Sequence, residues 1–383
     1  MLMRGSWRRG FAALAVTTGL AVAPSAPAAA AVTGWTQVSA GSWHTCAVRS
    51  DATLWCWGAN DSGQLGVGDT AARQVPTQVG GAAWASVDTG LDHTCALKTD
   101  GIRYCWGRNT DGQLGLGDTT NRDAPRRIIG EAAWLSVSAT TYATCGIRTD
   151  ATLWCWGRNT DGQLGIGDTT GRTRPAQVGT QANWAMVSTA ENMACALKTD
   201  GTRYCWGANN TGQLGIGDRT GRTAPRRVVG EPAWRTITNG YPTGCGIRID
   251  GTLWCWGDNS WFQLGTGDAA ATDRLTPVMV SSRTSWTRVA MATGGRHACG
   301  QAAGVRYCWG LGAPGLGVGD LATRTTPSAV FDGPWTGLSA GFSHTCGIRN
   351  THLYCWGAGA MLGLVDDDDD DDDDAVTPVL IAA

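Results

Sequence analysis

Fourteen cysteines, arranged as seven pairs with none left over, constrain this chain more than any other feature. The two members of a pair lie nine or ten residues apart, and the second always stands in the tripeptide Cys-Trp-Gly. The pairs recur about every 50 residues, and a fixed period of this length predicts a repeat fold whose units pack against one another. The pairs are Cys46 with Cys56, Cys95 with Cys105, Cys145 with Cys155, Cys195 with Cys205, Cys245 with Cys255, Cys299 with Cys308, and Cys346 with Cys355.

Each repeat opens with a tryptophan and contains four short segments of β type. In the second repeat we expect strands at 84–87, 94–98, 103–106 and 125–129. Turn residues separate these segments, and none of them has the period of a helix. The sequence therefore predicts an all-β chain of four-stranded units. The repeats start near residues 35, 84, 134, 184, 234, 286 and 335.

The cysteine spacing follows the length of a hairpin loop. With a three-residue loop at 99–101, Cys95 lies opposite Cys105, and opposed residues of antiparallel strands are about 4.5 to 5.5 Å apart, within reach of a disulfide. The last two repeats have cysteines one residue closer, and two-residue loops at 303–304 and 350–351 restore the same pairing. We therefore predict one disulfide within a hairpin of every repeat. Zinc sites need closer ligand spacing than these pairs have.

The amino terminus has the pattern of a secretory signal peptide over residues 1–31. Arg4, Arg8 and Arg9 precede an apolar run at 11–23, which is followed by prolines and an alanine tract. The run has 13 residues, whereas a membrane-spanning helix needs about 20, so a membrane anchor is the weaker interpretation. Export leads to an oxidising compartment, where paired cysteines form disulfides. We therefore expect a secreted protein with no membrane span after cleavage.

The net charge of the chain is −2, and it combines segments of opposite charge. Without the three signal-peptide arginines the charge is −5, and without the nine aspartates at 366–374 as well it becomes +4. This mild positive charge is scattered over turns and forms no basic stripe or tail. The sequence therefore gives no support to nucleic-acid binding.

Seven similar units can stack as an open solenoid or close into a ring. An open stack needs polar capping repeats at its ends, and this chain has none. We therefore predict a monomeric seven-bladed β-propeller that forms one domain over residues 32–383. Residues 376–381 supply the last strand, after an aspartate loop at 366–374. The repeat phase leaves open which termini close the ring.

Alternate repeats differ in the two residues before the second cysteine. Odd repeats have Leu-Trp, or Leu-Tyr in the seventh, and even repeats have Arg-Tyr. The alternation fails between the seventh repeat and the first, where ring closure would place the seam. We interpret it as packing chemistry between blades.

The repeat pattern resembles that of a known family. G-x-x-H-T-C-A-L, L-W-C-W-G, N-x-x-G-Q-L-G-x-G-D and a proline-containing strand follow one another in order, as in the regulator of chromosome condensation repeat. The resemblance implies a seven-bladed propeller used as a protein-binding platform. The nuclear founder of the family catalyses guanine-nucleotide exchange on a small GTPase while bound to nucleosomes, and a secreted propeller with similar repeats inhibits β-lactamases.

This chain looks like a secreted, bacterial-type relative of that family. It departs from the nuclear member because it has an export signal, a cysteine pair in every repeat and no basic tail. Intracellular exchange activity is therefore disfavoured, and no exchange residues are assigned.

The positions three and four residues before each first cysteine vary most between repeats. In a ring they form one rim, and their aromatic and large apolar residues suit a protein-contact surface. The alternative is neutral drift in exposed loops. We name as the contact rim Trp43, Leu91, Asp92, Tyr142, Asn192, Tyr241, Arg296 and Phe342.

The sequence gives little support to a metal or cofactor site. His44, His93, His297 and His344 would occupy adjacent blades, too far apart to share one ion, and structural hydrogen bonding is the favoured interpretation. The glycine-rich QLG motif lacks the acidic ligands of a calcium loop and is interpreted as connection chemistry. Weak calcium capture by the aspartate run is an alternative, and its candidate ligands are Asp366, Asp368, Asp370, Asp372 and Asp374.

No cofactor is expected, and no catalytic residue is assigned, because the chain has no nucleophile elbow, no metal-ligand motif and no repeated acidic pair beyond turn aspartates. The favoured function is a secreted, non-enzymatic platform that binds a protein or a cell-surface macromolecule through the contact rim. The alternatives are an enzyme inhibitor of the β-lactamase-inhibitor kind, a hydrolase or lyase with a site in the central channel, and a guanine-nucleotide exchange factor.

Overall fold

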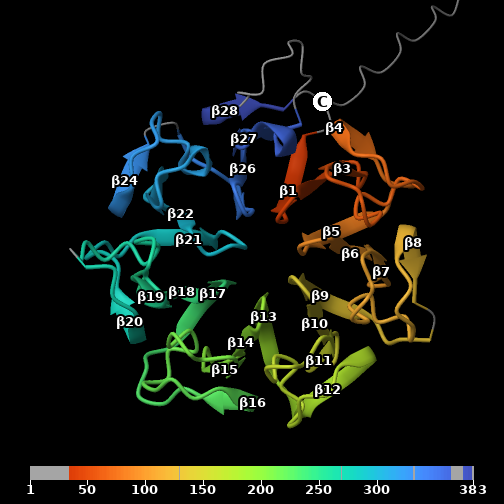
Figure 1. Ribbon diagram of the computed structural model, residues 1–383, viewed down its shortest axis with the longest axis horizontal. Coiled ribbons are helices and arrows are strands. Elements are labelled where there is room, and N and C mark those ends of the chain that lie inside the picture. Colours follow the sequence, from red (N-terminus) through yellow and green to blue (C-terminus); the bar gives the residue numbers. More distant parts are fainter. Residues whose placement is uncertain (1–33, 129, 269, 331–332, 364–373, 382–383) are drawn as a thin grey trace, which may run out of the picture. The chain divides into compact units, whose positions relative to one another are not determined.

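The computed structural model describes residues 34–128, 130–268, 270–330, 333–363 and 374–381. The unit that begins at Thr33 is a ring of sheets around a central axis (Figure 1). Its described residues form seven sheets, each with four antiparallel strands in consecutive order. The predicted all-β, seven-bladed propeller is therefore confirmed. The predicted signal peptide, residues 1–31, lies outside the described residues.

Each blade runs outward from the axis as the chain proceeds (Figure 1). The innermost strands are β1 (Trp35–Ala40), β5 (Trp84–Thr89), β9 (Trp134–Ala139), β13 (Trp184–Ala190), β17 (Trp234–Gly240), β21 (Trp286–Met291) and β25 (Gly337–Ala340). The second strands are β2 (His44–Arg49), β6 (His93–Lys98), β10 (Ala143–Arg148), β14 (Met193–Lys198), β18 (Thr243–Arg248), β22 (His297–Ala302) and β26 (His344–Arg349).

The two outer positions complete each blade. The third strands are β3 (Leu54–Gly58), β7 (Arg103–Gly107), β11 (Thr152–Gly157), β15 (Arg203–Gly207), β19 (Leu253–Gly257), β23 (Val305–Gly310) and β27 (His352–Gly357). The outermost are β4 (Arg73–Gln78), β8 (Arg122–Arg127), β12 (Arg172–Ala182), β16 (Arg222–Arg227), β20 (Arg274–Met279), β24 (Arg324–Val330) and β28 (Ala375–Leu380). Two short 3-10 turns are η1 (Pro314–Leu316) and η2 (Gly359–Met361).

The predicted disulfides are confirmed in all seven blades. Each joins directly paired residues of the second and third strands, as the loop lengths indicated. The bonds join Cys46 to Cys56, Cys95 to Cys105, Cys145 to Cys155, Cys195 to Cys205, Cys245 to Cys255, Cys299 to Cys308, and Cys346 to Cys355.

The strands approach one another more closely at these bonds than expected from the sequence. The Cα atoms of the bonded cysteines are 4.0 to 4.2 Å apart. In the second blade, Lys98 and Ile102 form a hydrogen-bonded pair, so Cys95 and Cys105 three positions further fall on a non-hydrogen-bonded pair. Antiparallel strands are closest at such pairs.

The predicted hairpin loops are confirmed as well. In the sixth and seventh blades the pairing ends at Ala302↔Val305 and Arg349↔His352, which leaves two-residue loops with positive φ throughout. In the second blade, Gly101 has φ of 78°, the left-handed value that glycine adopts most easily. The fourth strand of that blade begins earlier than expected, because pairing with β7 resumes at Gly107↔Arg122 after a bulge.

The Cys-Trp-Gly tryptophans join neighbouring blades. The indole N–H of Trp106 donates to the Gln64 carbonyl of the preceding blade at 2.9 Å, and the same bond recurs at the other junctions. Gly66 of the QLG motif packs on this ring, and a Cβ there would lie 2.5 Å from the Trp106 Nε1. The QLG motif therefore also joins neighbouring blades, a role beyond the connection between strands that the sequence indicated.

The ring closes by contact between complete blades. Trp57 Nε1 of the first blade donates to the Met361 carbonyl of the seventh at 3.1 Å, as at every other junction. Ile348 and Leu353 pack with Trp35 in one apolar cluster across this seam. No strand is exchanged in the described sheets, because each contains four consecutive strands. The question of how the termini close the ring is thereby answered.

The alternation between odd and even blades has a packing cause. Arg103 of the second blade is buried, donates to the Leu114 carbonyl and to Glu131, and lies 4.1 Å from the Trp156 ring of the third blade. Arg203 repeats this arrangement at the next even blade. The odd-blade leucine Leu153 is fully buried in an apolar cluster instead. Arginine in even blades and leucine in odd blades therefore pack between neighbouring blades in alternation.

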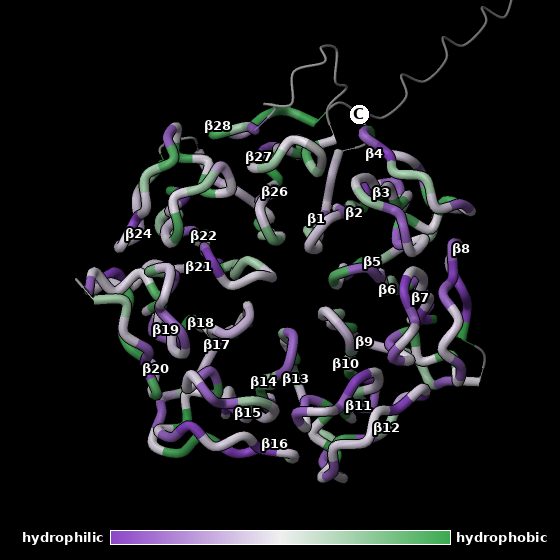
Figure 2. Tube along the Cα trace, viewed as in Figure 1, coloured by the Kyte–Doolittle hydropathy of each residue, from purple (hydrophilic) through white to green (hydrophobic). Residues whose placement is uncertain are grey.

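The outermost strands are the open edges of the sheets, and their sequences disfavour pairing with a further strand. β8 and β16 are largely hydrophilic, whereas β28 is hydrophobic (Figure 2). All three contain a proline, which has no N–H to donate at an open edge.

Candidate functional site

The contact rim lies on one face of the propeller, in the loops between the first and second strands. In the third blade the Arg158 N–H donates to the Tyr142 carbonyl at 2.9 Å, and in the first blade the Ala59 N–H donates to the Trp43 carbonyl at 2.8 Å. Equivalent bonds recur in the other blades. The residue after Cys-Trp-Gly is thus held beside a contact-rim residue in five blades, and beside the neighbours Pro242 and Ser343 in the fifth and seventh.

Three contact-rim residues form a continuous cluster on the sixth, seventh and first blades, in which Arg296 and Trp43 are exposed and Phe342 is partly buried. The rings of Phe342 and Trp43 are 5.2 Å apart, and the Arg296 guanidinium lies 5.1 Å from the Phe342 ring. Trp261, from the QLG loop of the fifth blade, extends the cluster because its ring lies 5.4 Å from Arg296. Trp43 is 40% exposed and Trp261 is 44% exposed. We name these four residues the aromatic sector.

A second group on this face is charged, and it contains two contact-rim residues, Asp92 and Tyr142. Asp92 of the second blade pairs with Arg108 at 3.5 Å, and Arg108 also lies 5.3 Å from the Tyr142 ring. Arg158 lies closer to the same ring, at 3.6 Å, and donates to Asp111 at 2.9 Å. We name these five residues the charged sector. Its two arginines occupy the space between an aromatic ring and carboxylates.

The remaining contact-rim residues are Leu91, Asn192 and Tyr241, and each makes other contacts. Leu91 is partly buried, and its N–H donates to the Thr140 carbonyl of the third blade at 3.4 Å. Asn192 hydrogen-bonds the Tyr241 hydroxyl, whose pKa is raised by burial and then by the negative charge of Glu191. The structure therefore divides the predicted rim into distinct surfaces.

A cavity of about 670 Å³ opens between the two sectors. Trp43, Ala59 and Met361 supply apolar walls, and Asp61 and Asp92 supply carboxylates. Burial raises the pKa of Asp92, while the nearby Arg108 opposes that shift and Asp61 adds to it. The cavity thus combines an aromatic face with carboxylates, one of them partly removed from water.

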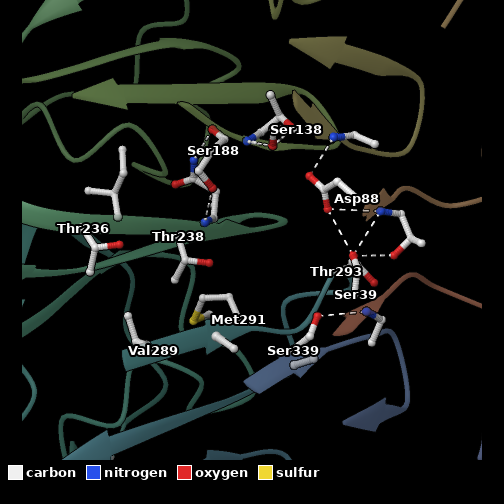
Figure 3. A pocket seen from close by; sticks show the side chains of 18 of the residues that line it. Ser39, Asp88, Ser138, Ser188, Thr236, Thr238, Val289, Met291, Thr293 and Ser339 are labelled. Atoms are coloured by element: carbon white, nitrogen blue, oxygen red, sulfur yellow. Dashed lines mark hydrogen bonds between the residues drawn. The ribbon is translucent and has the colours of Figure 1, made fainter. Parts of the chain in front are cut away.

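The central channel is a separate space of about 300 Å³ lined by the innermost strands (Figure 3). Hydroxyl side chains surround it, and the Ser42 and Thr293 hydroxyls lie 3.3 Å apart at the end nearer the contact rim. Several lining side chains accept a hydrogen bond from the next blade, as Ser138 does from the Thr189 N–H and Ser339 from the Ala40 N–H.

Asp88 is the single ionisable side chain among the described residues that line this channel. Burial raises its pKa to about 6, although it accepts hydrogen bonds from the Ala139 N–H, the Thr89 N–H and the Ser39 hydroxyl. These contacts join the first three blades (Figure 3). A single carboxylate held by main-chain donors lacks the second acid or base that hydrolysis of a glycoside needs.

The histidines connect blades. His44 Nε2 lies 2.8 Å from the Thr94 hydroxyl, which donates to the Gln64 carbonyl, so the imidazole is the donor. The other three make the same contact with a threonine of the following blade, at 2.8 to 2.9 Å. Burial lowers the pKa of His44 to about 3, so the ring is neutral at ordinary pH. The hydrogen bonding matches the structural interpretation of these residues.

Metal ligation has no assembled site among the residues that the structure describes, where no three acidic, histidine or cysteine side chains are grouped to hold an ion. Of the aspartate run, Asp366, Asp368, Asp370 and Asp372 lie outside the described residues, and Asp374 accepts from the Gly359 N–H. In the same described residues, no helix has the length and apolar character needed to span a membrane.

Sequence reasoning missed several residues of this face. Trp261 lies in a QLG motif that reads W-F-Q-L-G, whereas the first four blades have a glycine before the Q-L-G and a serine, threonine or aspartate before that glycine, and it is outside the periodic set of tryptophans. Arg108 and Arg158 follow Cys-Trp-Gly, where other blades have alanine, leucine or aspartate. Comparison of this position between repeats would have found both arginines.

Family models of the regulator of chromosome condensation (RCC1) repeat match most of the chain. One model matches residues 51–97, 100–147, 150–197, 200–241 and 250–300, and a second matches 35–64, 84–113 and 134–163. No curated protein sequence matches the chain significantly.

Solved structures show the same fold at low identity. Yeast RCC1 (Prp20), solved bound to Kap60, is 20% identical with a TM-score of 0.75, over 92% of this chain and 84% of that one. Human WBSCR16 is 20% identical with a TM-score of 0.73, over 82% and 87%. The CRINKLY WD40 ectodomain of the Arabidopsis thaliana receptor kinase ACR4 is 20% identical with a TM-score of 0.54, over 88% and 99%.

Proposed function

Because this chain belongs to the RCC1 repeat family, we propose that it is a secreted, non-enzymatic protein that binds a macromolecular partner through the contact rim. The aromatic sector carries the proposal. Large aromatic residues and arginine dominate the energetics of protein interfaces, and here they form one continuous cluster over four blades, exposed except for the partly buried Phe342.

Secretion is supported by the seven buried disulfides and by the signal-like amino terminus. Disulfides of this density persist in oxidising compartments and are rare in the cytosol. The proposed extracellular setting also favours a protein or cell-surface partner over a nuclear GTPase.

Relatives with this fold bind proteins. Yeast RCC1 was solved bound to Kap60, and a second structure of Prp20p from Saccharomyces cerevisiae was described together with its binding to Gsp1p and histones. Those partners belong to those proteins. The relatives support binding as the general activity of the scaffold, and the aromatic sector is where we place it in this chain.

Enzyme inhibition is a narrower form of the same proposal. An inhibitor needs a rigid surface that keeps its shape on binding, because ordering a mobile surface costs affinity. The disulfide in each blade holds the two strands beside the contact rim, which suits such a role. A catalytic role for the channel is disfavoured because Asp88 has no second ionisable group beside it among the described lining residues.

Substitution of the contact rim tests the proposal. We expect a triple variant with Trp43→Ala, Tyr142→Ala and Phe342→Ala to weaken capture of the partner from whole culture by at least about 100-fold, because hot-spot aromatics each contribute about 2 kcal/mol or more. Capture is measured by quantitative mass spectrometry of the bound fraction.

The control is a double variant with Leu135→Ala and Ile249→Ala. It removes two exposed apolar side chains from the ends of the strands that lie away from the contact rim. It should capture the partner as the unchanged protein does. Undiminished capture by the contact-rim variant, with both proteins folded, would exclude the contact rim as the binding surface.

A further inference from the structure

The cavity beside Trp43 lies where another blade of the same chain has an arginine side chain. In the third blade, the residue after Cys-Trp-Gly is Arg158, and its guanidinium lies 3.6 Å from the Tyr142 ring and 2.9 Å from Asp111. An arginine thus occupies the space between an aromatic ring and a carboxylate, and it belongs to the protein itself.

The first blade has the same backbone at this position but a smaller side chain. Ala59 follows Cys-Trp-Gly, and its N–H donates to the Trp43 carbonyl just as the Arg158 N–H donates to Tyr142. Trp43 therefore stands where Tyr142 stands in the third blade. With a methyl group in place of the arginine, the space beside the ring is the cavity of about 670 Å³.

Carboxylates also line the first-blade cavity, although their positions in the repeat differ from that of Asp111. Asp61 belongs to the QLG loop of the first blade, and Asp92 belongs to the second blade. Asp92 has a 22% exposed side chain, and its contact with Arg108 is 3.5 Å, longer than a close ion pair. Arg73, the one cation in the described cavity wall, is paired with Asp69 at 2.6 Å.

We propose that this cavity binds an arginine side chain of the protein partner, with the guanidinium stacked on Trp43 and paired with Asp61 and Asp92. This inference deepens the proposed function and depends on it. Arginine suits the site because its planar guanidinium both stacks on aromatic rings and pairs with carboxylates. The third blade shows the same combination satisfied from within the chain.

A short peptide tests the site without the natural partner. The probe is acetyl-Gly-Arg-Gly-amide, and the matched control peptide has citrulline, which keeps the shape of arginine without its charge. We expect the arginine peptide to shift the fluorine NMR signal of Trp43 in protein labelled with 5-fluorotryptophan, and Trp43→Phe identifies that signal. The citrulline peptide should bind at least about tenfold more weakly.

A variant that fills the cavity provides the sharper test. Ala59→Arg places an arginine where Arg158 stands in the third blade, so it should occupy the cavity and abolish the peptide-induced shift. Ala208→Arg changes the equivalent position of the fourth blade, away from the cavity, and should leave the shift intact. A double variant with Asp61→Asn and Asp92→Asn removes the charges without adding bulk and should also weaken binding at least about tenfold.

The outcomes separate this inference from the proposed function. Equal shifts with the arginine and citrulline peptides, or an unaltered shift in folded Ala59→Arg and in the asparagine variant, would overturn the arginine site. If the contact-rim variant loses the partner while Ala59→Arg captures it normally, the binding surface stands and the arginine site fails. If neither affects capture, the proposed function fails.

Discussion

Asp88 occupies the channel position that serine holds in four other blades, at Ser39, Ser138, Ser188 and Ser339. Serine here accepts a hydrogen bond from the next blade while remaining neutral. Asp88 accepts the equivalent bond from the Ala139 N–H at 3.0 Å, but it does so with a partly buried carboxylate. The same contact is therefore made with a group that is costly to ionise.

Replacement of Asp88 by serine should stabilise the protein at neutral pH. Its pKa is about 6 in the folded protein and about 3.8 when unfolded, so ionisation opposes folding as pH rises from about 4 to 6. Because Asp88 is only partly buried, we discount the full shift for solvent screening and expect Asp88→Ser to gain about 1 to 2 kcal/mol at pH 7 and less than about 0.5 kcal/mol at pH 4. Denaturant unfolding at both pH values measures the difference.

The comparison with unchanged protein matters because the four buried histidines act with the opposite sign. Their pKa values are lowered to about 3 or 4, so they make both proteins less stable as pH falls below about 6.5. Taking the difference between the two proteins cancels this effect. A stability gain of the same size at pH 4 and pH 7 would show that the charge of Asp88 is not its cause.

At the scale of the element, the repeated unit is a hairpin joined by a disulfide. Cys95 and Cys105 are fully buried and ten residues apart. A crosslink of this span reduces the conformational entropy of the unfolded chain by an amount worth about 2.5 to 3 kcal/mol. Burial of both sulfurs also places them among the apolar residues that pack against the next blade.

Removal of one disulfide should therefore weaken the ring without changing its fold. We expect a double variant with Cys95→Ala and Cys105→Ala to lower the free energy of unfolding by about 2 to 4 kcal/mol, because the entropic effect adds to that of a small cavity. Calorimetry measures the loss, and circular dichroism checks the fold. Unchanged stability would contradict this prediction, because a hairpin that persists in the unfolded chain would remove only the entropic part of the loss.

The elements were the part of the structure most open to prediction from the sequence. Loop length and cysteine spacing change together in the sixth and seventh repeats, and this coupling predicted the pairing of Cys299 with Cys308 and of Cys346 with Cys355. The contact-rim loops could be located, but their division into sectors could not. That division depends on contacts between blades, such as that of Phe342 with Trp43, which are 299 residues apart.

The cavity was beyond prediction for a related reason. It exists because Ala59 is small, and the sequence gives no sign that an arginine is missing until Arg158 is seen stacked on Tyr142. Residues after Cys-Trp-Gly were treated as part of the repeat pattern. Ala59 and Arg158 both follow Cys-Trp-Gly, and the shared backbone hydrogen bond confirms that the two positions are equivalent in space.

At the scale of the whole molecule, seven complete blades close the ring through the same contacts that join any two neighbours. The bond from Trp57 to the Met361 carbonyl at the seam is equivalent to that from Trp106 to Gln64 between the first two blades. The contact rim therefore continues across the seam, and the aromatic sector spans it. The arrangement of the aromatic sector therefore depends on closure of the whole ring.

Hydrogen–deuterium exchange of the protein with its captured partner tests the central claim most directly. We predict slower exchange on binding at residues 41–43 and 342–343, in the loops that carry Trp43 and Phe342, and no change at 249–251 on the opposite face. Protection confined to the opposite face, with the contact-rim loops unaffected, would contradict the account.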